Sequence, residues 1–412
     1  MTIKDIKLDK IGMWLLLAFV AVCPIFYDTA NVRGVGTLRL GQEQMYQLGA
    51  TILFTIVFLE NIYLAIFFLW CITLYFYFNF PPIAGNYVVN IFWGLLIYQI
   101  VYKLVDFKNV RKVFNVIACL AALNMLWIGL QFLNVDLIFL DKAGAVKTYS
   151  HDFTGLMGLK AHMGIFFALA VPIVCYYRIW LAIPLFIPIY LSDCSVAMVG
   201  GISALLFAIW FQSRKLCIIL TLLLGILGSI YIARDIKLSG EMFTNRLSLW
   251  KVSLRDAFKH PITGWGLDSF RNMGTFKPFM YFANARTGES GTVSAQALKM
   301  HNETGKLPPM DFIKDGDSIN PWDHPHNEYI SLLYETGMVG VVIIGFLLVN
   351  IIHRFYPNDF IIPLAGYFIV ILVVSIGQFP FHVARNGAHI PIFLAIYYKL
   401  TDLSKEMELS HD

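Results

Sequence analysis

Long uncharged apolar segments recur along this chain and constrain its fold more than any other feature. The segment from Leu216 to Ala233, for example, contains no charged side chain. A helix of about 20 such residues crosses the hydrocarbon layer of a bilayer. Of all residues, 58% are hydrophobic and 14% are charged, whereas about a quarter are charged in soluble domains. The sequence therefore predicts a membrane protein.

Helices are expected in these segments, because a membrane barrel strand would alternate apolar and polar residues. A helix also satisfies its backbone hydrogen bonds internally, as a bilayer requires. The predicted fold is all-α, a polytopic membrane bundle of about twelve helices. Their predicted ranges are 11–27, 44–60, 62–80, 87–105, 113–133, 159–177, 179–191, 194–212, 216–233, 333–352, 359–377 and 386–400. The seventh contains Pro184 and Pro188 and is expected to be broken or only partly inserted.

The positions of Lys and Arg predict the orientation of this bundle. If the N-terminus is cytoplasmic, the cytoplasmic connections hold thirteen of these residues and the short outer connections hold six. Cytoplasmic connections usually carry such an excess, so both termini are predicted to be cytoplasmic. The chain then has helices one to nine in residues 1–233, a long outer connection in 234–327, and three helices with a tail in 328–412.

Charge and cysteine content add two expectations. The net charge of +4 is spread over many loops, so no nucleic-acid partner is expected; membrane lipids are the expected surroundings. The six cysteines stand singly in or beside apolar segments. Such cysteines are typical small core residues, and no disulfide framework is predicted.

The outer connection is too long for a simple link, and its length predicts a function. Apolar residues at helical spacing predict an amphipathic helix at its start, which rests on the bundle or on the membrane interface. They are Leu247, Trp250, Leu254, Ala257 and Phe258. Pro261 is expected to end this helix, and Gly264 and Gly266 to form a tight turn. The polar segment 287–317 is expected to be a mobile stretch or a lid.

Two sequence blocks in this connection carry a resemblance to a known family. The first contains RLSLW from Arg246 to Trp250 and HPITGWG from His260 to Gly266, followed by Phe270. The second contains HNEYI from His326 to Ile330 and ETGMVG from Glu335 to Gly340. In this order they resemble the superfamily of O-antigen ligases, O-antigen polymerases and bacterial protein O-oligosaccharyltransferases. The resemblance covers about a hundred residues.

The resemblance implies a glycosyltransferase in the bacterial inner membrane, with its active site facing the periplasm. Such an enzyme moves a glycan from undecaprenyl pyrophosphate to an acceptor hydroxyl. The acceptor is lipid A core in a ligase, another glycan in a polymerase and a protein in an oligosaccharyltransferase. The ligase of lipopolysaccharide biosynthesis is favoured here. No metal and no other cofactor is implied.

The resemblance also assigns catalytic residues. The family histidine falls on His326 and the family arginine on Arg246. A neutral histidine accepts a proton near pH 7 and contributes roughly 10²–10⁴ in rate as a general base. An arginine binds phosphate oxygens through two parallel hydrogen bonds. Direct attack on the anomeric carbon predicts inversion, with no covalent sugar-enzyme intermediate.

One departure from the family concerns a Ser-Arg pair at a middle helix. Here the equivalent stretch is SDCSV from Ser192 to Val196, which lacks the arginine. Other outer cations are expected to bind the pyrophosphate, and the neighbours of His326 are expected to contact substrate. These residues are Arg33, Arg39, Lys160, Arg385, His324 and Asn327. Asn327 is also predicted to cap the helix that follows it.

Several alternatives stay open. Asp323, His324 and His326 could ligate a metal, although spacing alone is weak evidence for this. The Arg-x10-Gly pattern associated with polymerases occurs once, at Arg255 and Gly266. A lipid-linked glycan flippase or another transporter is the alternative from a different class. Such proteins usually carry charged residues at mid-membrane and repeated halves, and this sequence shows no internal repeat.

Overall fold

The computed structural model describes residues 62–77, 82–133, 160–235, 249–251, 253–267, 269–272, 280–283, 290–292, 318–321, 325–378, 380 and 389–409. The chain divides into two compact units. The first comprises Met1–Ala65, Val89–Ile226 and Phe346–Asp412, and the second comprises Ile66–Val88 and Leu227–Gly345.

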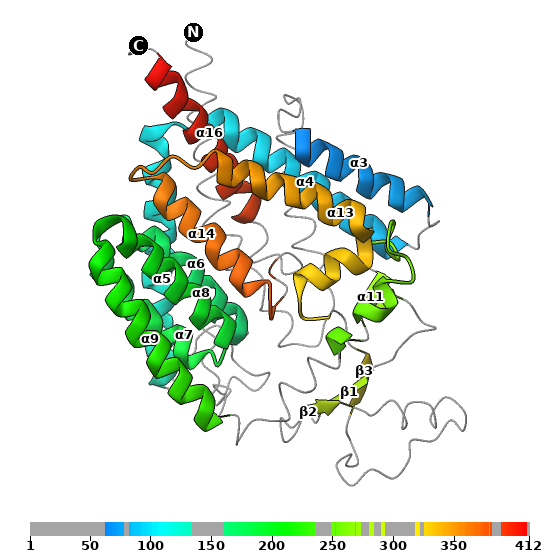
Figure 1. Cartoon of the computed structure of the whole chain (residues 1–412), viewed down its shortest axis with the longest axis horizontal. Helices are drawn as coiled ribbons and strands as arrows, with labels where there is room; N and C mark the ends of the chain where they lie inside the picture. The colour runs from blue at the N-terminus through cyan, green and yellow to red at the C-terminus, as the bar shows by residue number, and fades with distance from the viewer. Residues whose placement is uncertain are drawn as a thin grey trace. The chain divides into compact units, whose positions relative to one another are not determined.

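Helices make up most of the described chain (Figure 1). They are α3 (Ile62–Tyr77), α4 (Pro82–Leu104), α5 (Phe107–Phe132), α6 (Lys160–Cys175), α7 (Phe186–Leu191), α8 (Ser195–Gln212), α9 (Arg214–Asp235), α11 (Ser269–Asn272), α13 (Glu328–His353), α14 (Ile361–Val374) and α16 (His389–Leu409). The predicted segments 11–27 and 44–60 lie outside the described residues. The helical character predicted from the sequence is confirmed in the part that is described.

Three of the described helices, α5, α8 and α13, are long and apolar enough to cross a membrane. Shorter apolar helices include α6 and α14. The predicted break in the seventh segment is confirmed. Residues Ile179–Leu185 form a 3-10 helix that contains Pro184, and α7 follows it directly.

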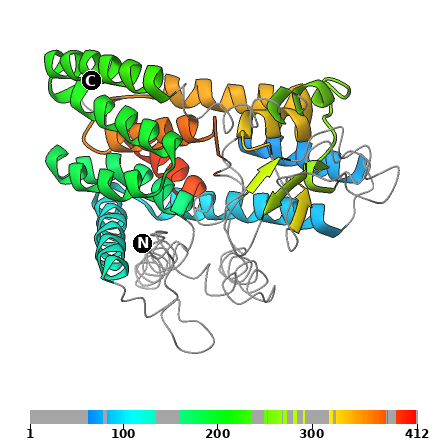
Figure 2. The same ribbon diagram turned by 90° about the horizontal axis from the view of Figure 1, so that it is seen from below.

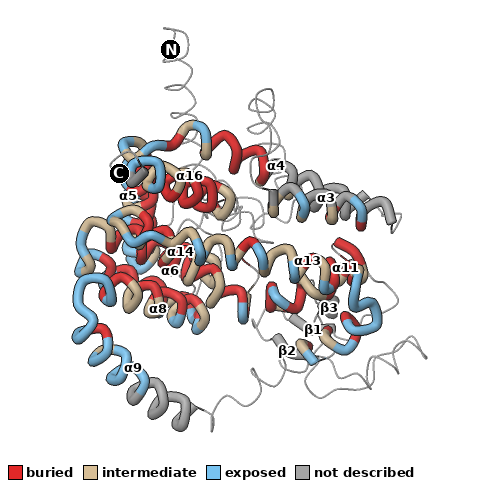
Figure 3. The backbone as a smooth tube through the Cα atoms, turned by 45° about the horizontal axis from the view of Figure 1, so that its top comes forward, coloured by how far each residue is buried: buried red, intermediate tan, exposed pale blue. Residues whose placement is uncertain are grey.

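The core of the first unit is formed by α6, α8 and α14, which pack against one another and lie side by side in Figures 1 and 2. Every residue of α6 from Met163 to Cys175 is buried. Figure 3 shows the contrast with α9, which is exposed over much of its described length. The exposed side chains of α9 include apolar ones such as Leu222, which is 63% exposed. Apolar exposure of this kind is typical of a surface that contacts lipid or another protein.

Small residues bring these core helices close together. A Cβ added at Gly200 of α8 would lie 3.3 Å from Cγ atoms of Val370 and Val374 in α14. A Cβ at Gly366 of α14 would lie only 2.8 Å from the Cβ of Pro172 in α6. Helices that associate in membranes use small residues for this purpose, because lipid tails provide no hydrophobic force between helices.

The second unit contains a small sheet that the sequence analysis did not predict. Its strands are β1 (Met280–Ala283), β2 (Ser290–Thr292) and β3 (Ser318–Pro321), in the order β2-β1-β3 and antiparallel. These strands are three or four residues long. Alternation is not visible in a run that short, so sequence periodicity could not have found them.

Substitution of Gly366 tests the packing of the first unit. Gly366→Ala is expected to lower the free energy of unfolding by about 1–3 kcal/mol, because the new methyl group overlaps Pro172. The matched control is Gly129→Ala in α5, where an added Cβ meets nothing within 4 Å. Thermal unfolding of the purified protein in detergent measures both. Equal stability of the two variants would contradict the close contact of α6 and α14.

Candidate functional site

The two sequence blocks of the outer connection meet at a break in α13. Gly337 has φ 66° and ψ −170°, inside a helix that otherwise runs from Glu328 to His353. Only glycine adopts such a conformation readily. In a continuous helix the Met338 N–H would donate to the Tyr334 carbonyl. It donates instead to the carbonyl of Pro261, at 2.7 Å. Figure 1 shows the change in direction between the two segments of α13.

Carbonyl groups of α13 beside the break receive hydrogen bonds from outside the helix. The N–H of Trp265 donates to the Tyr334 carbonyl at 2.7 Å. The N–H of Gly266 donates to the Glu335 carbonyl at 3.0 Å. The indole N–H of Trp70, in α3, donates to the Thr336 carbonyl at 3.0 Å. The turn and α3 thus replace the internal hydrogen bonds that the helix loses, as buried backbone groups require.

Two glycines permit this close approach of the turn to the helix. Gly264 has a φ of 67°, and a Cβ there would lie 2.6 Å from the backbone nitrogen of Gly337. A Cβ at Gly337 would lie 2.1 Å from the carbonyl oxygen of Ile262. Real Cβ atoms do not approach backbone atoms so closely. The turn predicted from Gly264 and Gly266 is therefore confirmed, and its partner is the break at Gly337. We call this arrangement, residues 261–266 bound to residues 334–339, the docked turn.

Aromatic rings pack around the docked turn. The rings of His260 and Trp265 have centroids 4.0 Å apart, and Trp265 stacks on Tyr334 at 6.4 Å. Phe270 meets Tyr334 edge to face at 5.2 Å. The indole N–H of Trp265 also donates to the Asp256 carbonyl at 2.8 Å. Large rings with few rotatable bonds make the turn a rigid support.

His326 lies at the start of α13, in the same unit as the docked turn. Its φ is 52°, in the left-handed region, which costs roughly 1–2 kcal/mol for a residue with a Cβ. On one side, the indole N–H of Trp250 donates to the Pro325 carbonyl at 2.9 Å. On the other, Oδ1 of Asn327 accepts a hydrogen bond from the Ile330 N–H at 3.0 Å. The predicted helix cap at Asn327 is confirmed.

The imidazole of His326 is only partly accessible. Its Nδ1 atom is buried, while the residue as a whole is half-buried. A histidine with a fixed backbone and a shielded ring nitrogen has few orientations available to it. The site can therefore present one defined edge of an imidazole, which is what a general base needs.

Three acidic residues are buried near these segments of the second unit. Asp256, Glu328 and Glu335 are 3%, 7% and 2% exposed, respectively. Asp256 pairs with Lys259 one turn later, with Oδ1 and Nζ 2.7 Å apart. Lys259 was not predicted from the sequence as a site residue, although its half-exposed ammonium group lies beside the turn. The sequence gives no signal for it, because acidic and basic residues three positions apart are common on any helix.

The predicted amphipathic helix is present in the described residues. Residues 249–251 and 253–257 are helical, and Phe258 follows them in a turn. Leu249, Ser253, Asp256 and Ala257 are buried, whereas Phe258 is 61% exposed. The polar side chain of Ser253 is accommodated in this buried face because its hydroxyl donates to the Leu249 carbonyl at 2.7 Å.

Lys160 is the first residue of α6, in the first unit, and pairs with Asp193 at 3.4 Å. Both side chains are well exposed, at 42% and 82%. Asp193 belongs to the SDCSV stretch and has a φ of 53°. The other predicted site residues lie outside the described residues, as does most of the expected lid at 287–317. They are Arg33, Arg39, Arg246, His324 and Arg385, together with the candidate metal ligand Asp323.

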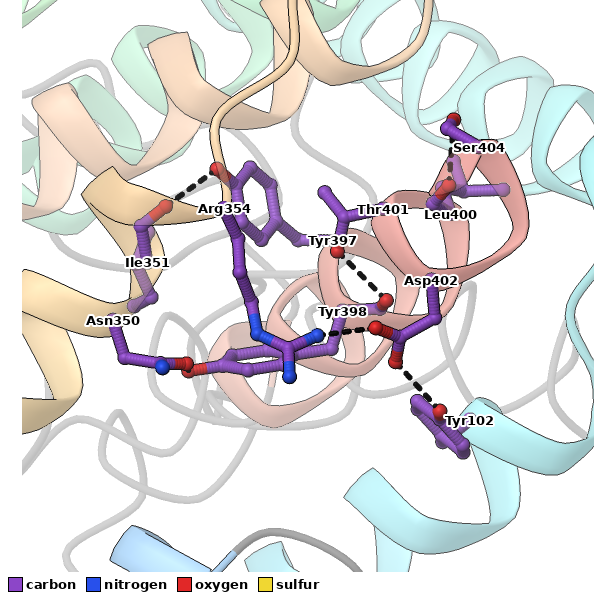
Figure 4. A network of polar contacts seen from close by, with 10 residues as sticks. All are labelled: Tyr102, Asn350, Ile351, Arg354, Tyr397, Tyr398, Leu400, Thr401, Asp402 and Ser404. Atoms are coloured by element: carbon purple, nitrogen blue, oxygen red, sulfur yellow. Dashed lines mark hydrogen bonds and ion pairs between the residues drawn. The ribbon is translucent and has the colours of Figure 1, made fainter. Parts of the chain in front are cut away.

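A second polar cluster lies in the first unit, at the C-terminal end of α13 (Figure 4). Arg354 forms an ion pair with Asp402 of α16 and lies over the ring of Tyr398, 4.8 Å from its centroid. Asp402 also accepts a hydrogen bond from the Tyr102 hydroxyl of α4 at 2.7 Å. The Tyr398 hydroxyl donates to the Asn350 side chain at 2.7 Å. The ion pair and these two hydrogen bonds together join α4, α13 and α16.

Comparison with known proteins assigns no family to this chain. No model of a known family matches the chain, and no curated protein has a detectably similar sequence.

Replacement of Gly337 tests the docked turn. Gly337→Ala is expected to cost more than about 3 kcal/mol of stability, because the methyl group would collide with the Ile262 carbonyl in a glycine-only conformation. Gly345→Ala in the same helix is the matched control, since a Cβ there meets nothing within 4 Å. The yield of monodisperse protein and its unfolding temperature report the difference. If both variants behave alike, the docked turn is not needed for folding.

The ion pair of Arg354 and Asp402 can be tested with a double-mutant cycle. The side chains are 27% and 30% exposed, so a coupling of about 1–2 kcal/mol is expected, above that of a surface pair. The variants are Arg354→Gln, Asp402→Asn and both together, followed by thermal unfolding. A coupling indistinguishable from zero would mean that the cluster does not hold the end of α13.

Proposed function

We propose that this protein is a bacterial inner-membrane glycosyltransferase of the O-antigen ligase type. It transfers a glycan from undecaprenyl pyrophosphate to an acceptor hydroxyl, with the active site facing the periplasm and both termini in the cytoplasm. The observation that carries the proposal is the docked turn. The two blocks that resemble the family lie about seventy residues apart in the sequence and are bonded to one another through their backbones.

His326 is the general base of the proposed reaction. The acceptor is a sugar or side-chain hydroxyl, which is a poor nucleophile until a base removes its proton. The acceptor oxygen forms a bond to the anomeric carbon while the bond from that carbon to the pyrophosphate oxygen breaks. The proton moves to His326, and undecaprenyl pyrophosphate leaves with the electron pair. Attack from the face opposite the leaving group inverts the configuration.

Cations stabilise the pyrophosphate as its negative charge develops. Arg246 is the first candidate, from the block that also contains Trp250, and Arg33, Arg39 and Arg385 are the others. Preorganised donors of this kind are worth roughly 10²–10³ in rate. Lys160 is a further candidate from the sequence. Its exposed pair with Asp193 is worth only about 0.2–1 kcal/mol.

A transporter receives less support from the charges of the first unit. Transporters place paired ionisable groups within the membrane, where substrate or ions pass. In the pair of Arg354 and Asp402, Arg354 follows His353, the last residue of α13, and Asp402 belongs to α16. Its aromatic and amide partners come from packed helices, as expected for a structural clamp at a helix end.

The experiment is glycan transfer by the purified protein in the presence of EDTA. The donor is an undecaprenyl-pyrophosphate-linked glycan, and the acceptors tested are lipid A core, a second carrier-linked glycan and a pilin-like protein. His326→Gln is expected to lower the transfer rate by roughly 10²–10⁴, because the variant cannot accept the proton. The matched control is His353→Gln at the other end of α13, where the wild-type side chain is exposed.

The outcome with each acceptor distinguishes the branches of the family. Transfer to lipid A core supports the ligase, and transfer to the second glycan or to the pilin-like protein supports the polymerase or the oligosaccharyltransferase. Undiminished transfer by His326→Gln would refute the catalytic role of this histidine. The flippase becomes the better explanation if the donor crosses vesicle membranes but no acceptor is ever glycosylated.

A further inference from the structure

Three tryptophans of the second unit each donate an indole N–H to a main-chain carbonyl. Trp70 donates to Thr336 at 3.0 Å, Trp265 to Asp256 at 2.8 Å, and Trp250 to Pro325 at 2.9 Å. The first two bonds belong to the docked turn and its support. The third differs, because its acceptor is the carbonyl of the peptide that joins Pro325 to His326.

We propose that Trp250 is a positioning residue for His326, an inference that rests on the proposed role of His326 as the base. The peptide unit between Pro325 and His326 is planar. A bond to its oxygen therefore fixes the orientation of the whole unit and, with it, the φ angle of His326. That angle is 52°, a conformation that residues with a Cβ avoid unless their surroundings hold them in it.

The hydrogen bond from Trp250 opposes relaxation of the strained backbone at His326. If this bond is removed, rotation of the peptide brings the φ of His326 back to negative values and moves the imidazole away from its present place. The following residue cannot prevent this change. Asn327 is fixed through its own side chain, which caps the Ile330 N–H, and this cap does not hold the peptide on the other side of His326.

Trp250 is not needed simply to attach its helix. Leu249 and Ala257 of that helix are 1% and 0% exposed, and Ser253 is 3% exposed. These residues form its buried face, whereas Trp250 is half-buried. The indole bond instead reaches a residue 75 positions away in the sequence. It connects the first sequence block to the peptide that precedes the proposed base.

The test compares Trp250→Phe with Trp70→Phe in the full-length protein. Each substitution keeps an aromatic ring and removes one indole N–H that bonds a main-chain carbonyl. A second form of the test replaces the Trp250 indole with benzothiophene through an unnatural amino acid. This replacement removes the N–H with almost no change in shape, so the variant folds even if phenylalanine leaves a gap.

Two readouts besides stability separate positioning from packing. The first is the rate at which diethyl pyrocarbonate modifies His326, followed by peptide mass spectrometry as a function of pH. The second is the division of the transfer rate between kcat and KM. For Trp250→Phe we expect about a tenfold lower kcat, an unchanged KM for the donor and a severalfold change in the modification rate of His326. For Trp70→Phe we expect a lower unfolding temperature, with kcat and His326 reactivity as in the wild type.

The outcomes also separate this inference from the proposed function. If Trp250→Phe and the benzothiophene variant change only the unfolding temperature, Trp250 does not position His326 and the inference is wrong. If His326→Gln still transfers glycan, the proposed catalytic role fails, yet the modification rate still reports whether Trp250 controls the conformation of His326. A loss of both kcat and His326 reactivity in Trp70→Phe would also overturn the inference, because the effect would not be specific to Trp250.

Discussion

The second unit depends on one constraint, namely that backbone groups released by a break in a buried helix must find other partners. Each unsatisfied polar group in apolar surroundings costs several kcal/mol. At Gly337 the released groups are bonded by the 261–266 turn and by Trp70 of α3. Segments far apart in the sequence are therefore held together by main-chain hydrogen bonds, which depend little on side-chain identity. Gly264 and Gly337 are specified strictly, because the backbones there approach too closely for a Cβ.

A second strained residue of this unit, His326, precedes α13 by two positions. A left-handed histidine is tolerated only where its surroundings prevent it from relaxing. The bond from the Trp250 indole to the Pro325 carbonyl supplies such a restraint, while Trp265, Tyr334 and Phe270 pack as rings at the docked turn. The helix that carries Trp250 is tied to this turn, through the Asp256 carbonyl and the Trp265 indole. The helix that bears the restraint is thereby anchored at its other end.

The sequence predicted much of the helical content because long apolar runs leave few alternatives in a bilayer. It also predicted the cap at Asn327 and the turn at Gly264 and Gly266, which follow from local chemistry. It did not predict the break at Gly337 or its partners, because nothing local distinguishes a helix glycine in a close contact from one in open space, such as Gly345.

The candidate site was predicted through its motifs, and the structure gives those motifs different physical roles. In the second block, the glycine of ETGMVG forms the break, and the asparagine of HNEYI forms the cap. In the first block, the HPITGWG turn replaces the lost helical bonds, and Trp250 fixes the peptide before His326. Most of these residues therefore hold segments of the main chain together and need not touch a substrate. In the proposed reaction, the chemistry falls to His326 and to the cations that bind the pyrophosphate, and the other residues of the two motifs maintain the fold around them.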